Sequence, residues 1–253
     1  MKEIVHLNCV KIVSPINDNV CGHCLLIKEN DQLLLIDTGI GLLDVRNPTE
    51  RIGQPLIDIV GYQFDEKQTA IKQIESLGFN PNKVNHCIIS NLDNDHIGGL
   101  ADFPNATVHV GVEEFENFNA GNPRYLKTPL AHHPTMKTYP KSYMSWFGFE
   151  ARKIDVNIET EIFLIPLFGH TLGHCGVAIK WSNKWLFYIA DAYYMNVELT
   201  DSNHPVNELA KIRADNNNLR LATLDKIRKL VNEHPEIEVW GYHDIEEFNR
   251  YKS

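Results

Sequence analysis

The chain has 253 residues and a formal net charge of −9, with 43% hydrophobic and 23% charged residues. The composition is that of a globular protein, and we expect a single domain over residues 1–253. The acidic balance argues against nucleic acid or an anionic membrane as the main partner, and the longest apolar runs, such as residues 33–36 and 186–190, are too short to span a bilayer.

The first part of the chain alternates predicted strands and turns. Its first ten residues carry a charge at Glu3 and lack a long apolar core, so they are not expected to form a signal peptide, and we expect a cytoplasmic protein. Strands are predicted at 5–13, 21–28, 32–39 and 83–90. Residues 40–64 suggest a loop with one short helical stretch near the mouth of a site. A helix is predicted from Asp65 as N-cap to residue 77, with Gly78 as its stop.

The rest of the chain repeats this plan. A polar cluster at residues 91–96 leads into a helix beginning at His96. Residues 120–150 are interpreted as a long connection without periodicity. The other predicted elements are strands at 106–111, 151–156, 161–167, 175–181, 184–191 and 237–244, helices at 112–118 and 217–232, and a short closing helix. Each half therefore has several strands, a helix and a buried strand with a polar end, which favours two β-rich layers with helices outside.

The five cysteines do not indicate a disulfide framework, because their number is odd and the chain looks cytoplasmic. Cys21-Gly-His-Cys24 has the spacing of a redox or metal motif. Redox motifs of this kind stand at the start of a helix, where the thiol pKa is lowered, whereas this one leads into a predicted strand. We therefore expect Cys21 and Cys24 to be reduced and dispensable, with a redox pair as the minor alternative.

Polar residues follow four predicted strands, where a rigid scaffold can present them to a cleft. Taken singly, each histidine is more often a surface or core residue than a ligand, and the two aspartates of the first cluster could simply cap the helix that follows. Their joint occurrence favours a metal site, because histidine and carboxylate ligands suit zinc and similar ions. The candidate ligands are Asn91, Asp93, Asp95, His96, His170, Asp191 and His243.

The motifs D-x-D-H-I-G-G-L and G-H-T-x-G-H, followed by an aspartate and a late histidine, resemble those of the metallo-β-lactamase superfamily, as does Asp37-Thr38-Gly39 after an early strand. The resemblance extends from about residue 20 to 245, and its nearest branches are lactonase-like and uncharacterised hydrolases. It implies an α+β fold, a four-layer αββα sandwich of two mixed β-sheets with helices outside and two metals at one edge.

The resemblance also implies a role for each site residue. Asp93 and His170 would belong to the first metal site. Asp95, His96 and His243 would belong to the second, and Asp191 would bridge both. Asp95 and Asp191 are the residues that we expect to act in catalysis, with metal-bound water or hydroxide as nucleophile. Asp37 is expected to be structural, near the site and not a ligand.

Asn91 departs from the family pattern, which has a histidine at this place. An amide oxygen is a weak ligand for zinc, and Asp93 in place of a second histidine makes the first site richer in oxygen. We therefore expect one or two Zn²⁺ ions, with Mn²⁺ or Fe²⁺ as alternatives at the first site. The hypothesis is that the first ion binds more weakly than the second because of Asn91.

The expected partner is a small-molecule substrate with an ester-like bond, a lactone ahead of a thioester. Alternatives are a thioesterase of the glyoxalase II type, a non-catalytic metal-binding relative with an incomplete first site, and, ranked lower, a one-iron persulfide oxygenase. A homodimer is one option for the oligomeric state. The role of the 120–150 segment stays open between lining an apolar pocket and packing on the sandwich, through Tyr139, Tyr143, Met144, Trp146, Phe147 and Phe149.

Overall fold

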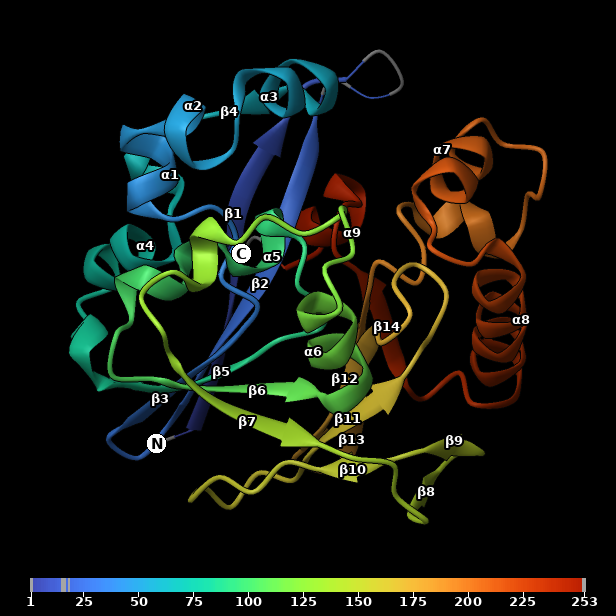
Figure 1. Cartoon of the computed structure of the whole chain (residues 1–253). Coiled ribbons are helices and arrows are strands. Elements are labelled where there is room, and N and C mark those ends of the chain that lie inside the picture. Colours follow the sequence, from blue (N-terminus) through green and yellow to red (C-terminus); the bar gives the residue numbers. More distant parts are fainter. Residues whose placement is uncertain (1, 15–16, 18, 252–253) are drawn as a thin grey trace.

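The larger of two β-sheets is formed mainly by the first half of the chain (Figure 1). The computed structural model describes residues 2–14, 17 and 19–251. The strand order is β4-β1-β2-β3-β5-β6-β7, antiparallel from β4 to β3 and parallel from β3 to β7. The strands are β1 (Lys2–Ile12), β2 (Val20–Glu29), β3 (Gln32–Ile36), β4 (Tyr62–Gln63), β5 (Val84–Ile88), β6 (Thr107–Gly111) and β7 (Thr135–Tyr139).

The second sheet has the order β10-β11-β12-β13-β14. Its pairs are antiparallel except for β13 and β14, which run parallel, so this sheet is mixed as well. A small hairpin, β8–β9, stands beside it. These strands are β8 (Ser145–Trp146), β9 (Phe149–Glu150), β10 (Arg152–Lys153), β11 (Ile162–Pro166), β12 (Cys175–Trp181), β13 (Lys184–Ala190) and β14 (Glu238–Gly241).

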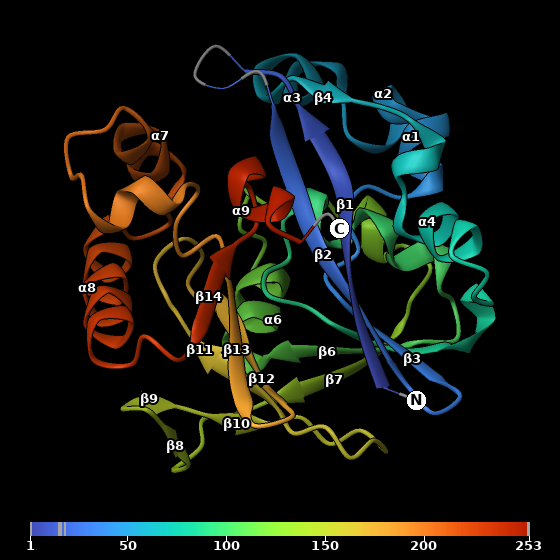
Figure 2. The same cartoon turned by 180° about the vertical axis from the view of Figure 1, so that it is seen from behind.

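Helices cover the outer faces of the sheets. Figures 1 and 2 show α1 to α4 beside the larger sheet and α7 and α8 beyond the smaller one. No helix in the described part of the chain is both long and apolar enough to cross a membrane. The helices are α1 (Leu42–Arg46), α2 (Pro48–Arg51), α3 (Gln54–Val60), α4 (Ala70–Ser76), α5 (Asn94–Ile97), α6 (Val112–Asn119), α7 (Val206–Arg213), α8 (Asn217–Glu233) and α9 (Ile245–Asn249), with 3-10 turns η1 (Glu66–Gln68), η2 (Pro81–Lys83), η3 (Gly98–Asp102), η4 (Thr128–Leu130) and η5 (Asn196–Leu199).

The strand β11 shows how the layers are built. Because side chains alternate along a strand, Ile162 and Leu164 face the main core, which includes residues of both sheets. Phe163 and Ile165 face the second core, where the smaller sheet packs on α8. Apolar burial on both faces of the sheet holds the layers together. The predicted four-layer αββα sandwich of two mixed sheets with outer helices is therefore confirmed.

The element boundaries differ from the predictions in two regions. Asp65 caps only the turn η1, through Lys67 N–H, and α4 begins after Thr69, so the predicted helix starts later than expected. Residues 40–64 form three short helices rather than one. The helix α7 and the strands β7 to β9 were not predicted, because neither segment has a strong apolar period.

Two aromatic side chains of the 120–150 segment, Trp146 and Phe149, pack on the sandwich. The Trp146 ring lies 4.7 Å from that of Phe187 and 5.6 Å from that of Trp185. Phe149 lies 6.0 Å from Phe187 in the same cluster. Tyr143 is exposed. None of the six residues named for this segment lines the pocket described below, which favours the packing alternative for the buried ones.

Candidate metal centre

The four polar segments meet at one edge of the sandwich, at the ends of strands from both sheets. Parallel β13 and β14 end side by side, which brings Asp191 next to His243. Ligand atoms of six candidate residues form two groups, each within 4.8 Å. We call Asp93, His170 and Asp191 the first site, and Asp95, His96 and His243, together with Asp191, the second site.

Asp191 lies between the two sites. Its Oδ2 is 3.0 Å from His96 Nε2 and 3.0 Å from His170 Nε2. Its Oδ1 lies 3.5 Å from His243 Nε2 and is buried without a hydrogen-bond partner among the described residues. Burial acts to raise the pKa of Asp191, but the three histidines hold it well below its usual value. A buried, charged carboxylate oxygen without a hydrogen-bond donor is expected where the oxygen binds a cation.

Hydrogen bonds fix the orientation of the two histidines of the second site. His243 Nδ1 donates to the Cys21 carbonyl over 2.9 Å, and His96 Nδ1 donates to Asp37 Oδ2 over 2.8 Å. Both rings therefore turn Nε2 toward the cluster. Burial acts against a charge on His96, but Asp191 and Asp37 raise its pKa well above the usual value.

Asp37 supports His96 from behind, in agreement with its predicted structural role. Its carboxylate also accepts hydrogen bonds from the backbone N–H and hydroxyl of Ser90 and from the hydroxyl of Tyr188. Four donors thus hold one buried carboxylate in place.

Asp37→Asn should weaken zinc binding by about 10- to 100-fold, since an amide holds the His96 ring less firmly and adds no charge. The affinity is measured by competition with a chromophoric chelator. Glu29→Gln is the matched control, because Glu29 is also a buried carboxylate but bonds the distant Thr160. Equal affinities for the two variants would contradict the role of Asp37.

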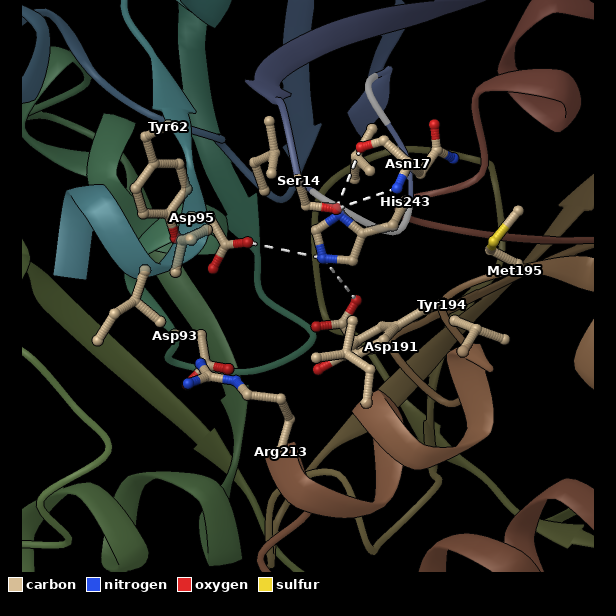
Figure 3. A pocket seen from close by; sticks show the side chains of 16 residues that line it. Ser14, Asn17, Tyr62, Asp93, Asp95, Asp191, Tyr194, Met195, Arg213 and His243 are labelled. Atoms are coloured by element: carbon tan, nitrogen blue, oxygen red, sulfur yellow. Dashed lines mark hydrogen bonds and ion pairs between the residues drawn. The ribbon is translucent and has the colours of Figure 1, made fainter. Parts of the chain in front are cut away.

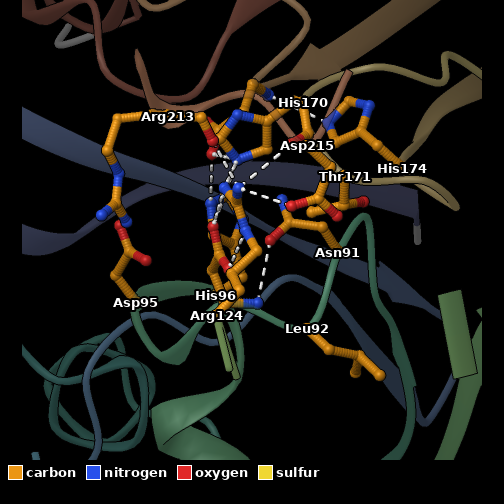
Figure 4. Close-up of polar contacts among 12 residues, drawn as sticks. Asn91, Leu92, Asp95, His96, Arg124, His170, Thr171, His174, Arg213 and Asp215 are labelled. Carbon is orange, nitrogen blue, oxygen red and sulfur yellow. Dashed lines mark hydrogen bonds and ion pairs between the residues drawn. The ribbon is translucent and has the colours of Figure 1, made fainter. Parts of the chain in front are cut away.

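The first site contains a residue that the sequence did not indicate. Arg124 Nε is 2.6 Å from Asp93 Oδ1, and Arg124 Nη2 is 2.6 Å from Asp93 Oδ2. Arg124 Nη2 also lies 2.7 Å from His170 Nε2, and Figure 4 shows these two side chains together. Burial acts to raise the pKa of Asp93, but Arg124 and His170 hold it well below its usual range. Asp93 occupies the N-cap position of α5 without a side-chain capping bond, so its carboxylate does not serve as the helix cap.

Asn91 is buried beside the first site. Its Oδ1 accepts from the Asp93 N–H over 3.0 Å, and its Nδ2 donates to Ser90 Oγ over 3.3 Å. The amide therefore shapes the turn that carries Asp93. That Asn91 is a weak metal ligand stays a prediction.

An open pocket lies in front of the second site (Figure 3). Its polar floor is formed by Asp93, Asp95, Asp191 and His243. Tyr194 and Arg213 stand beside them. Two of its apolar side chains come from α3, so the 40–64 segment does lie at the mouth of the site as predicted. The apolar lining consists of Ile12, Val20, Ile59, Val60, Met195, Val206 and Leu209.

Comparison with known proteins places this site in a family. A family model described as the metallo-beta-lactamase superfamily matches residues 21–241. The chain belongs to this superfamily.

Named relatives of this superfamily chain include hydrolases and lactonases. "Probable metallo-hydrolase Rv2300c" of Mycobacterium tuberculosis is 34% identical over 197 residues, which are 76% of this chain and 63% of that protein. "N-acyl homoserine lactonase AttM" of Rhizobium radiobacter is 29% identical over 63% of this chain and 60% of its own length. The chain thus matches less than two thirds of these relatives' length.

The fold agrees with that of a solved superfamily member. The structure of a B. thuringiensis AiiA mutant with N-decanoyl-L-homoserine bound at the active site has a TM-score of 0.76 and 20% identity. The alignment covers 98% of this chain and 96% of that one.

Further superfamily motif residues position the ligands. His174, the second histidine of G-H-T-x-G-H, accepts the Asp191 N–H at Nε2 over 3.1 Å and donates from Nδ1 to the Leu167 carbonyl. Burial, with the nearby His170, lowers the pKa of His174 to about 3, so the ring stays neutral. The motif quoted from the sequence contained His174, but only the structure gives its role.

Glu114 is a second positioning residue that the sequence did not reveal. Its buried carboxyl accepts from the Leu92 N–H over 2.7 Å, from the Thr171 hydroxyl over 2.6 Å and from the Tyr125 hydroxyl over 2.9 Å. It therefore joins the loop of Asp93 to the loop of His170. A single glutamate on a predicted helix gives no signal for such a role.

The second site fits the metal that the superfamily implies. It has two imidazoles and two carboxylates, a donor set that suits zinc. Asp191 Oδ1 points toward His243 and accepts no hydrogen bond from the described residues. Its lone pairs are therefore available to a metal ion at the place where the other ligand atoms meet. Two of the three residues of the first site, Asp93 and His170, are in contrast already in contact with Arg124.

Proposed function

We propose that the protein is a zinc-dependent hydrolase that opens the ring of a small lactone carrying an apolar chain. The observation that carries this proposal is the pocket, which places an apolar wall directly beside the second site. An ester ring can thus lie at the polar floor while its chain lies against the aliphatic side chains. Such a combination of apolar lining and few polar groups is typical of small-molecule sites.

The names of the relatives support the same class of substrate. AttM is named an N-acyl homoserine lactonase, and the AiiA structure contains N-decanoyl-L-homoserine, a molecule with an apolar chain. The aliphatic residues of α3 and α7 at the pocket suit such a chain. A nuclease is disfavoured by the net charge of −9.

We assign Asp95, His96, Asp191 and His243 as the residues that hold the ion. When bound there, the ion would supply Lewis acidity that activates water and polarises an ester carbonyl. His96 is held by Asp37 and His243 by the Cys21 carbonyl, so the donors are oriented before the ion arrives.

Tyr194 is the proposed hydrogen-bond donor to the substrate carbonyl. Its ring lies edge-on to those of His170, at 5.7 Å, and His243, at 5.3 Å. Burial and the charge of Asp191 raise the pKa of Tyr194, so the phenol keeps its proton and can donate it in a hydrogen bond. Arg213, in the same pocket, supplies a positive charge for a polar group of the substrate.

A panel of lactones tests the proposed function. Purified protein is assayed for acid release with homoserine lactones of increasing acyl length, with thioesters of the same acyl groups as the comparison. We expect kcat/KM to be highest for a lactone with a long chain. Preferred thioester hydrolysis would favour the thioesterase alternative, and no turnover of either class would favour a non-catalytic relative.

Leu209→Trp tests the apolar wall. A larger side chain in the pocket should raise KM for the long-chain lactone by about tenfold and change kcat for a short-chain lactone little. Ile212→Trp is the control, because Ile212 is on the same helix and is exposed away from the pocket lining. An equal effect of both variants, or none for Leu209→Trp, would show that the chain does not bind at this wall.

A further inference from the structure

We propose that the protein holds a single divalent ion, at the second site, and that the Arg124 guanidinium takes the place of the first ion. Arg124 Nη2 donates to Asp93 Oδ2 over 2.6 Å and to His170 Nε2 over 2.7 Å. These two atoms are the ones that the first ion would need as ligands. The inference rests on the proposed metal-dependent function and adds the number of ions and a role for Arg124.

The contacts of Arg124 exclude an ion at the same place. A zinc ion lies about 2.0 to 2.2 Å from its nitrogen and oxygen ligands and uses their lone pairs. Here both carboxylate oxygens of Asp93 accept N–H groups of Arg124. Arg124 Nη2, which can only donate, lies 2.7 Å from His170 Nε2, so the guanidinium fills the space from which an ion would contact this nitrogen.

The Arg124 side chain is held on every edge. Nε donates to Asp93 Oδ1, and Nη1 donates to the backbone carbonyls of His170 and Arg213. With the two bonds of Nη2, all five N–H donors of a guanidinium have an acceptor. The side chain is 9% exposed. A fully bonded, nearly buried guanidinium is a fixed part of the site, not a surface side chain that folds in by chance.

The backbone around Arg124 is fixed as well. The Arg124 N–H donates to Asn122 Oδ1 over 3.0 Å, and Asn122 Nδ2 donates to Asp215 Oδ2 over 3.1 Å. The next residue, Tyr125, is bonded to the buried Glu114. These contacts keep the guanidinium beside Asp93 without help from a metal.

The charges agree with one ion. Asp93 is paired with Arg124, while Asp95 and Asp191 together carry the two negative charges that balance one divalent ion. A second divalent ion would stand next to the fixed positive charge of Arg124, with no further carboxylate in either group to balance it. Both Asp93 oxygens accept hydrogen bonds from Arg124, whereas Asp191 Oδ1 has no hydrogen-bond partner among the described residues. This difference also favours a single ion at the second site.

The metal content of the purified protein tests the proposal first. Protein incubated with excess zinc and then dialysed should contain about one ion per chain by elemental analysis. His243→Ala, which removes a ligand of the second site only, should lose it. Two tightly held ions in the unchanged protein would overturn the inference and leave the proposed function standing. No bound ion would overturn both, and retention of the ion in His243→Ala would place it at the wrong site.

Variants at the first site test whether Arg124 or Asn91 prevents a second ion from binding there. Asn91→His alone should still hold about one ion, because the guanidinium remains, whereas Asn91→His combined with Arg124→Ala should hold about two. Circular dichroism verifies that each variant is folded. Arg213→Ala is the matched control, since it removes a nearby arginine whose side chain lines the pocket, and it should stay at about one ion.

Two ions in Asn91→His alone would show that the missing histidine, not Arg124, limits the first site. One ion in the folded double variant would also contradict the proposal, as would a second ion in Arg213→Ala. If the double variant does not fold, the ion count of the unchanged protein and of Asn91→His still decides.

Discussion

Replacing Asp191 with alanine should abolish hydrolysis and weaken metal binding together. The Asp191 carboxylate lies within 3.5 Å of three histidines, and its Oδ1 has no hydrogen-bond partner among the described residues. Removing it takes away a ligand and leaves His96 and His243 without their shared negative charge. We expect kcat/KM for a lactone to fall by on the order of 10³-fold or more, equivalent to about 4 kcal/mol.

Asp225→Ala is the control for this variant, because Asp225 is an exposed carboxylate on α8. It should leave turnover and metal content unchanged. Asp191→Asn keeps the size of the side chain and should lose most of the activity as well, since an amide oxygen is a poorer ligand. Turnover of Asp191→Ala within about threefold of the unchanged protein would place the reaction elsewhere.

Gly169→Ala should destabilise the fold and displace His170. Gly169 has a φ of +135°, where residues other than glycine are strained. A Cβ at this position would lie 2.1 Å from the backbone nitrogen of Arg220 and 2.4 Å from its Cα. We expect the free energy of unfolding to fall by more than about 3 kcal/mol, measured by urea denaturation.

Gly148→Ala separates the clash from the backbone strain. Gly148, in the turn between β8 and β9, also has a positive φ, of +81°, but a Cβ there would meet nothing within 4 Å. It should cost only about 1 kcal/mol. Equal losses in the two variants would mean that the contact with α8 does not explain why the motif has glycine before His170.

The sequence predicts much of the fold and most candidate ligands for a local reason. Alternating apolar residues mark the strands, and polar residues mark the strand ends, within a few neighbouring positions of the sequence. Asp95, His96 and Asp191 stand at characteristic positions of the sequence motifs. The structure brings these residues together with His170 and His243. The role of Asp37 followed from the resemblance and agrees with its bond to His96.

Arg124 could not be predicted, because it reaches the first site from a segment without periodicity. A lone arginine in N-P-R-Y-L has no local signal, and its partners lie 31 and 46 residues away in the sequence. The role of the aromatic side chains around Trp146 could not be decided from the sequence for a related reason. Aromatic content is the same for a pocket wall and for a packed surface, and only the contact with Phe187 decides between them.

Metal dependence of lactone hydrolysis is the most direct test of the account. The purified protein is assayed with a long-chain lactone before chelation, after removal of metal by a chelator and dialysis, and after stepwise return of zinc. We expect hydrolysis to disappear on chelation and to return fully at about one zinc ion per chain. Hydrolysis that survives complete removal of metal, or that fails to return with zinc in a folded protein, would contradict it.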